Sequence, residues 1–375
     1  VNNRKEYVMA EPISRYNYVF FIGDHFVAQM YRELANYENI RLCENGIIRG
    51  GRLLQKLHKV HWSYKLNQRC KLPLKNLWFR RMTEVKFPED KPICYVFFGG
   101  QYCIKDYGLA KYIRETNPEN KIVINFLDLI RHKHIADFEK IKRKSDLIVT
   151  YDSAEAQRYG IELFEQGIYS KLTEVTQPSD FDYDLYFVGY AKDRLERILA
   201  IHRYLTPNGV RCCFKLVGVP KDVVLDGEGL IRLPAPLPYR QVVDDIQRSR
   251  CILELTQKNA TGMTMRTCEA ICYQRKLLSD RIAIMDMEPM QFSTFTEVTD
   301  INIDFLKEPL NYKKFESDVS FSPISFIHFL KTSFWRRRMK HNYRVKHENI
   351  LLKPLGEGDA LLLRILRNKM KKCTR

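Results

Sequence analysis

The sequence predicts an α/β protein built from parallel sheets. Short runs rich in β-branched and aromatic residues alternate along the chain with stretches of helical pattern. Several of these runs are apolar at successive positions, which is typical of parallel strands covered by helices on both faces. The 375 residues, at roughly 150 per domain, indicate two domains that each bury a core of their own.

Seven of the runs predict strands, in chain order at 18–23, 93–100, 121–128, 146–152, 184–190, 211–219 and 251–255. An eighth strand is expected to begin at Lys276. After the fifth run, residues 192–205 place Leu195, Ile198, Leu199 and Leu205 on one face of a helix. A strand that ends in glycine and leads into a helix occurs at both 16–24 and 183–193. This weak repeat predicts two Rossmann-like halves.

A domain boundary is predicted near Gln177-Pro178-Ser179, because proline disfavours helix there and a new strand follows. The expected organisation is a first Rossmann-like domain over 1–178 and a second over 179–310. A closing region over 311–375 follows them. It is expected to hold a helix from about Pro323 and a basic amphipathic tail from 347.

Positive charge gathers at the end of the chain. The 62 basic and 45 acidic residues give a net charge of +17. Residues 331–375 hold fourteen Lys and Arg against three Asp and Glu, which is +11 and leaves +6 for the first 330 residues. Phe334 and Trp335 stand beside Arg336-Arg337-Arg338, a mixture typical of peripheral membrane helices. An anionic membrane is therefore an expected partner, a plain surface helix is the alternative, and nucleic acid is disfavoured because no recognised motif accompanies the charge.

Several classes of protein are disfavoured by missing signals. The sequence contains no run of about 18 apolar residues, the length needed to span a bilayer. Its N-terminus lacks a signal segment in which charged residues precede an apolar run. The ten cysteines are scattered without a zinc-binding pattern, so reduced thiols are expected. P-loop, dinucleotide-binding G-x-G-x-x-G and H-E-x-x-H motifs are absent. We expect a cytoplasmic, peripherally membrane-associated protein.

The most informative stretch runs from Cys251 to Asp280. A buried strand leads into a loop, and Thr261-Gly262-Met263-Thr264 opens a helix that carries Arg266 and Glu269. Backbone amides at a helix N-terminus beside a glycine can approach a diphosphate closely, and the helix dipole favours the anion. Glu269 could accept hydrogen bonds from a ribose diol. The alternative is a structural loop followed by a solvated glutamate.

This segment resembles the donor-nucleotide motif E-G-x-G-x-x-x-x-E-A of GT-B glycosyltransferases, and more closely that of bacterial cell-surface polysaccharide transferases. Gly262, Glu269 and Ala270 match the motif, whereas Thr261 and Thr264 replace its first glutamate and second glycine. In retaining members the first glutamate lies close to the sugar. The stereochemical outcome is therefore left open.

The resemblance extends over roughly 180–310. It implies that Gly189 permits the turn after the first strand of the donor domain, that Lys192 or Arg194 faces the diphosphate, and that FKLVGV, with Gly218, is the second strand. Gly189 and Gly218 are both expected to line the donor site. The implied fold has two Rossmann-like domains facing a cleft, with the nucleotide-sugar donor in the second and the acceptor in the first. Gly262, Met263, Thr264 and Arg266 would stabilise the departing diphosphate, with no metal or other cofactor.

The resemblance also implies an acceptor, a surface glycan or a lipid-linked glycan of lipopolysaccharide or capsule biosynthesis. In the first domain Asp24 and His25 follow the first strand, at the edge where open α/β sheets bind ligands. Either side chain could remove the acceptor proton in an inverting reaction. The alternative is a helix cap by Asp24 with an exposed histidine.

Other candidate residues favour structural roles. Asp128 and Asp152 follow strands and are expected to cap helices. The acids of Asp180-Phe181-Asp182 imitate a metal-binding motif but precede their strand, so they lie at the wrong edge of the sheet for the site. The histidine pairs His58 with His61 and His132 with His134 lack further metal ligands and are expected on solvated faces.

Two other functions stay open. One is a noncatalytic binding protein that uses the same scaffold to recognise an anionic membrane or nucleic acid. The other is an enzyme resembling sugar-nucleotide epimerases, which is disfavoured because its G-x-x-G-x-x-G loop and Tyr-x-x-x-Lys pair are not evident.

Overall fold

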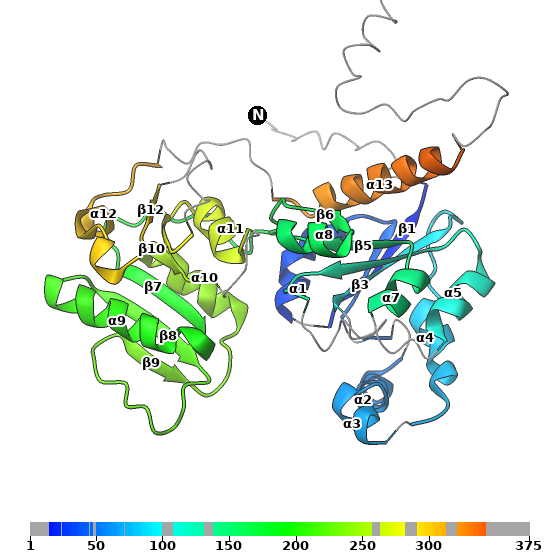
Figure 1. Cartoon of the computed structure of the whole chain (residues 1–375), viewed down its shortest axis with the longest axis horizontal. Helices are drawn as coiled ribbons and strands as arrows, with labels where there is room; N and C mark the ends of the chain where they lie inside the picture. The colour runs from blue at the N-terminus through cyan, green and yellow to red at the C-terminus, as the bar shows by residue number, and fades with distance from the viewer. Residues whose placement is uncertain are drawn as a thin grey trace, which may run out of the picture. The chain divides into compact units, whose positions relative to one another are not determined.

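The computed structural model describes residues 15–23, 25–44, 46–47, 50–70, 72–99, 108–130, 138–256, 263–281, 291–312 and 321–342. Within them lie two six-stranded sheets with helices packed on them (Figure 1). Every strand pair is parallel. The prediction of an α/β fold with two Rossmann-like sheets is therefore confirmed.

The first sheet has the order β2-β1-β3-β4-β5-β6. Its strands are β1 (Asn17–Phe21), β2 (Ile40–Cys43), β3 (Ile93–Phe98), β4 (Lys121–Phe126), β5 (Leu147–Thr150) and β6 (Glu162–Leu163). Its helices are α1 (His25–Met30), η1 (Arg32–Asn36), α2 (Arg52–His61), α3 (Tyr64–Arg69), η2 (Lys75–Trp78), α4 (Phe79–Thr83), α5 (Leu109–Thr116), α7 (Phe138–Lys144) and α8 (Ser153–Tyr159).

The second sheet has the order β9-β8-β7-β10-β11-β12, the 3-2-1-4-5-6 order of dinucleotide-binding Rossmann folds. Its strands are β7 (Tyr183–Tyr190), β8 (Cys212–Val217), β9 (Leu230–Leu233), β10 (Ser249–Glu254), β11 (Lys276–Ser279) and β12 (Phe292–Thr294). Its helices are η4 (Lys192–Arg194), α9 (Leu195–Leu205), η5 (Thr206–Asn208), α10 (Tyr239–Gln247), α11 (Met265–Cys272), η7 (Val298–Asp300) and α12 (Ile303–Lys307).

The central strands are buried on both faces, as their apolar runs predict. In β7, Leu185 and Phe187 enter one hydrophobic cluster, and Tyr186 and Val188 enter another on the opposite face. The predicted apolar face of α9 packs into the first of these clusters, since Leu195, Ile198 and Leu205 are buried there and Leu199 is half-buried.

The last strand of the first sheet ends at Leu163, and the first strand of the second sheet begins at Tyr183. The boundary predicted at 177–179 falls in the segment between them. A separate unit begins at Ser325. The helix expected from about Pro323 is present as α13 (Ile324–Asn342), while the tail from 347 lies outside the described residues. No helix of the described chain combines the length and apolarity needed to cross a membrane.

Of the two histidines of α2, His58 is not solvated as predicted. His58 is buried, with its ring 5.4 Å from that of Trp62 and 5.2 Å from that of Trp78. His61 accepts a 2.7 Å hydrogen bond at Nδ1 from the indole of Trp78. Aromatic rings therefore cover His58, because α2 turns this face toward the core, whereas His61 is only half-buried. His132 and His134 lie outside the described residues.

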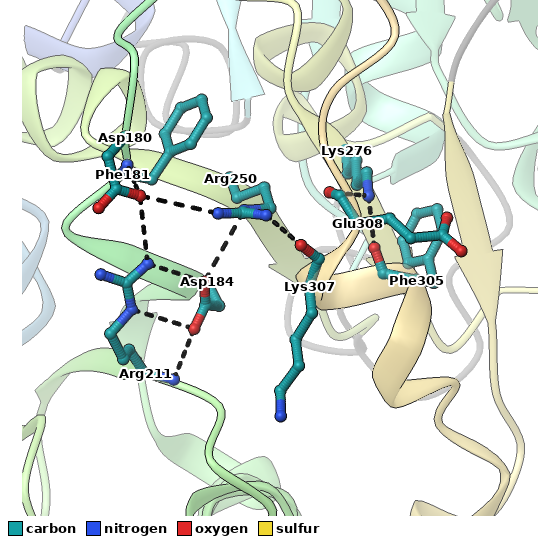
Figure 2. Close-up of polar contacts among 9 residues, drawn as sticks. All are labelled: Asp180, Phe181, Asp184, Arg211, Arg250, Lys276, Phe305, Lys307 and Glu308. Carbon is teal, nitrogen blue, oxygen red and sulfur yellow. Dashed lines mark hydrogen bonds and ion pairs between the residues drawn. The ribbon is translucent and has the colours of Figure 1, made fainter.

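A network of charges ties α12 to the amino ends of the second sheet (Figure 2). The Arg250 side chain lies 3.8 Å from the carboxylate of Asp184 and donates to the carbonyl of Lys307. Arg211 also pairs with Asp184, at 3.0 Å, and these arginines hold the pKa of Asp184 below its usual value although burial alone would raise it. Asp180 lies 3.7 Å from Arg211. The acids of 180–182 therefore sit at the amino edge of the sheet, paired with arginines, as the sequence predicts.

Lys276 is a buried cation in this network. Its Nζ donates to the carbonyls of Phe305 and Glu308, at 2.5 and 2.7 Å, and lies 4.8 Å from the Phe305 ring centroid. Burial lowers the pKa of this amine. The ammonium therefore fastens the end of α12 to β11.

Lys276→Met is expected to lower the free energy of unfolding by about 2–3 kcal/mol, because two carbonyls lose their donor in a buried place. Urea denaturation followed by circular dichroism measures the change. The matched control is Lys307→Met, which removes one exposed ammonium that donates to the Asn208 carbonyl at 2.7 Å. The control should cost under about 0.5 kcal/mol. Equal losses in the two variants would contradict this role of Lys276.

Candidate donor site

The strand order of the second sheet reverses between β7 and β10. Open α/β sheets bind ligands at such a point, outside the carboxyl ends of the strands. Here β7 ends at Tyr190, just after Val188 and Gly189, and β10 ends at Glu254. The helix that follows the β10 loop is α11, which carries the predicted residues.

The first turn of α11 is fixed by its cap and by a buried acid. Thr264 is the N-cap, and its hydroxyl accepts a 3.1 Å hydrogen bond from the amide of Arg266. The same hydroxyl donates to Glu254, to which Thr267 also donates at 2.7 Å. Glu254 is buried at the end of β10 and accepts a third hydrogen bond from Ser279 of β11. A buried carboxylate at the end of β10 therefore sets the position of the helix N-terminus.

Arg266 joins α11 to the end of β7. Its Nη2 donates to the carbonyl of Val188 at 3.0 Å, and its Nη1 pairs with the carboxylate of Glu269. The Arg266 side chain keeps 21% of its surface exposed, whereas that of Glu269 is fully buried. A cation thus lies at the switch point of the sheet with part of its surface open to a ligand.

Glu269 is the centre of a buried hydrogen-bond chain. Tyr239 at the start of α10 donates to Glu269 Oε1 at 2.8 Å, and its hydroxyl lies 2.6 Å from that of Tyr169. Complete burial raises the pKa of Glu269, while Arg266 and Tyr239 act in the opposite direction. Both carboxylate oxygens therefore have partners in this structure. Because the Glu269 side chain is fully buried, a ribose hydroxyl could reach it only if a neighbour such as Tyr239 moved aside, so the predicted ribose contact stays a prediction.

Two further cations lie at the same edge. Arg194 bridges the ends of the two central strands, donating to the carbonyls of Leu255 at 2.6 Å and Tyr190 at 2.8 Å. Burial lowers the pKa of Arg194. Lys192 is exposed, with its Nζ 6.0 Å from the Tyr190 ring centroid. Of the two, Lys192 has the more accessible charge, and the contact of either side chain with a diphosphate stays a prediction.

The turn after β7 differs from the prediction. Gly189 lies inside the strand, paired with Leu216, and its backbone is not left-handed. The left-handed residue is Lys192, at φ 46°. The prediction that Gly189 permits the turn is therefore wrong. Gly218 directly follows β8 in a left-handed conformation, at φ 73°, which favours glycine, and its contact with the donor stays a prediction.

The remaining predicted residues are placed as follows. Met263 is half-buried and packs on the cluster that holds Tyr186 and Val188. Asp24 and Gly262 lie outside the described residues, and of His25 only the backbone is described, as the first residue of α1. Asp152 is confirmed as a helix cap, because it accepts a 3.0 Å hydrogen bond from the amide of Glu155 in α8.

Sequence reasoning missed four residues of this site: Tyr239, Glu254, Asp280 and Arg281. Asp280 follows β11 and accepts from the amide of Thr256 at 2.9 Å and from Arg197 at 2.8 Å. Arg281 places its Nε 4.0 Å from Glu254. A lone glutamate in the apolar run CILEL was a signal that could have identified Glu254. The part of the chain that the structure describes holds no group of three or more His, Cys, Asp or Glu residues suited to a metal ion.

Comparison with known proteins finds similarity only at the level of solved structures. No protein-family model matches the sequence, and no curated protein matches it. A crystal structure of TarM is 10% identical, with a TM-score of 0.41 over 66% of this chain and 54% of that one, so the match spans about half of TarM. The glycosyltransferase SnogD from Streptomyces nogalater is 11% identical, with a TM-score of 0.37 over 80% and 93%. The DNA-modifying enzyme β-glucosyltransferase, solved with and without uridine diphosphoglucose, is 11% identical, with a TM-score of 0.40 over 88% and 99%.

Proposed function

We propose that this chain is a glycosyltransferase that moves a sugar from a nucleoside-diphosphate donor to a glycan or lipid-linked acceptor. One observation carries the proposal: the capped N-terminus of α11 and the Arg266 guanidinium meet the carboxyl end of β7, 3.0 Å from Val188 O, where the strand order reverses. Helix amides and an arginine at such a point suit a diphosphate.

In the proposed reaction these residues stabilise the negative charge of the leaving group. Cleavage of the glycosidic bond leaves negative charge on the departing diphosphate. Arg266 holds a cation at the switch point, and the ion pair with Glu269 raises the pKa of its guanidinium although burial alone would lower it. Preorganised donors of this kind stabilise a developing anion without a metal ion.

We further propose that Asp24 or His25 removes the proton of the acceptor hydroxyl, and that the acceptor belongs to surface polysaccharide biosynthesis. A lipid-linked acceptor would explain an association with anionic membrane. Trp335, Arg336 and Arg337 are exposed on α13, a composition that suits the interface of such a membrane.

Binding of a free nucleoside diphosphate is the direct test. Isothermal titration of the chain with UDP, GDP, CDP, ADP and dTDP should give one of them a dissociation constant in the micromolar range. Binding should persist in the presence of EDTA, since the proposed contacts come from protein groups. If none of the five binds while duplex DNA binds with strong salt dependence, the chain is a noncatalytic binding protein and the proposal is wrong.

A further inference from the structure

The connection between β2 and β3 carries an unusual share of positive charge. Residues 45–83 include ten Lys and Arg and no Asp or Glu. Of the net charge of +17, this segment holds +10 and residues 331–375 hold +11, which leaves −4 for the rest of the chain. Two of its helices, α2 and α3, pack against each other (Figure 1). The first domain therefore has a basic surface of its own.

Helix α2 has a buried face and an exposed apolar face. Its buried face presents His58, and Leu54 packs against the core of the first sheet. Leu53, Leu57 and Val60 lie on another face and are 71%, 50% and 59% exposed. Their spacing of four and three residues places them in one stripe along the helix. This stripe is the apolar surface of α2.

More exposed apolar residues follow in the same connection. The structure leaves eleven large hydrophobic side chains exposed in the described part of the chain, and six of them lie between residues 53 and 77. The three beyond α2 are Leu66 of α3, Leu74 before η2, and Leu77 within η2. Concentrated exposure of this kind marks a surface that meets an apolar partner.

Cations border the apolar surface of α2. Arg52, Lys56 and Lys59 are all exposed. At 100° per residue Lys56 lies beside the stripe, with Arg52 and Lys59 next to it, on the side turned away from His58. Long basic side chains in this position can reach phosphates while neighbouring leucines enter an apolar layer.

We propose that α2 docks this protein on anionic lipid: Leu53, Leu57 and Val60 enter the headgroup boundary of the bilayer, and Arg52, Lys56 and Lys59 contact lipid phosphates. Nucleic acid would use the charge but not the leucines. A second copy of the chain would use the leucines but would bring the exposed cations Arg52, Lys56 and Lys59 of two copies together. The inference rests on the membrane association in the proposed function and names the surface responsible; it does not depend on sugar transfer.

Sedimentation with vesicles tests the surface in the full chain. The wild type should bind vesicles of phosphatidylcholine with phosphatidylglycerol much better than phosphatidylcholine alone. The triple variant Leu53→Ser, Leu57→Ser, Val60→Ser should lower the partition coefficient at least about tenfold, and Lys56→Glu with Lys59→Glu should do the same on anionic vesicles. The matched control is Val224→Ser, an apolar side chain 82% exposed after β8, which should bind as the wild type does.

Three results would overturn the inference. The first is a triple variant that binds vesicles as well as the wild type does. The second is a wild type that binds neutral and anionic vesicles equally well. The third is a wild type that light scattering shows to be a dimer, together with a triple variant that is a monomer. DNA affinity that falls in the lysine variant while vesicle binding does not change would assign the surface to nucleic acid instead. Nucleoside-diphosphate binding by the triple variant should equal that of the wild type, so failure here is distinct from failure of the proposed transferase.

Discussion

Arg266→Ala should reduce turnover by about 10²- to 10³-fold, the loss expected when a preorganised donor to a developing anion is removed. The guanidinium donates to the Val188 carbonyl of β7 and pairs with the Glu269 carboxylate of α11, so contacts with both elements fix its position. Release of the nucleoside diphosphate under saturating donor measures the turnover number, with the folded fraction checked by circular dichroism.

Two variants make this measurement specific. Arg266→Lys keeps the charge but loses the second donor of the planar guanidinium, so we expect an intermediate loss. Arg240→Ala removes an exposed guanidinium on α10 and should leave turnover unchanged. Wild-type turnover in Arg266→Ala would remove Arg266 from the site and with it the observation on which the proposed function depends.

Glu269→Ala should lower both stability and donor affinity. The loss of the carboxylate leaves Arg266 with a charge that is only 21% exposed and leaves the Tyr239 hydroxyl without its acceptor. Breaking a buried pair from one side costs about 3–5 kcal/mol, and partial exposure of Arg266 favours the lower end, about 3 kcal/mol. Urea denaturation measures this loss, and calorimetry with the nucleoside diphosphate measures the affinity of the folded protein.

Tyr239→Phe separates the effect of Glu269 on stability from its effect on donor affinity. It removes the hydrogen bonds of the Tyr239 hydroxyl with Glu269 and with Tyr169, each worth about 1 kcal/mol, and leaves the ion pair with Arg266 in place. If Glu269 binds a ribose hydroxyl in place of Tyr239, this variant should keep or improve donor affinity. A loss of affinity as large as that of Glu269→Ala would show that the carboxylate acts through the hydrogen-bond chain and not through the ligand.

The sequence predicts the centre of each sheet better than its edges. The runs at 18–23, 93–100, 184–190 and 251–255 become strands buried on both faces, so their apolar pattern is continuous. The four strands that the pattern did not predict, β2, β6, β9 and β12, are the four edges of the two sheets. Edge strands are short and partly exposed, so they lack the apolar run by which a central strand is recognised.

The site was predictable only where its residues are close in the chain. Arg266 and Glu269 are three residues apart on one helix, and the structure pairs them. Tyr239 reaches Glu269 from another helix, a contact that no local pattern encodes. The apolar surface of α2 was missed for a related reason, since leucines at helical spacing predict a core face, and only the packing of His58 and Leu54 shows which face is buried.

The short edges have a consequence for behaviour at high concentration. β2 and β9 have four residues each, β12 has three and β6 has two. A neighbouring molecule that tried to extend either sheet would find a template of only a few hydrogen-bonding groups at each margin, too little to nucleate fibrils by strand addition. Crowded solutions of this protein should therefore resist cross-β aggregation, despite the many β-branched and aromatic side chains in its central strands.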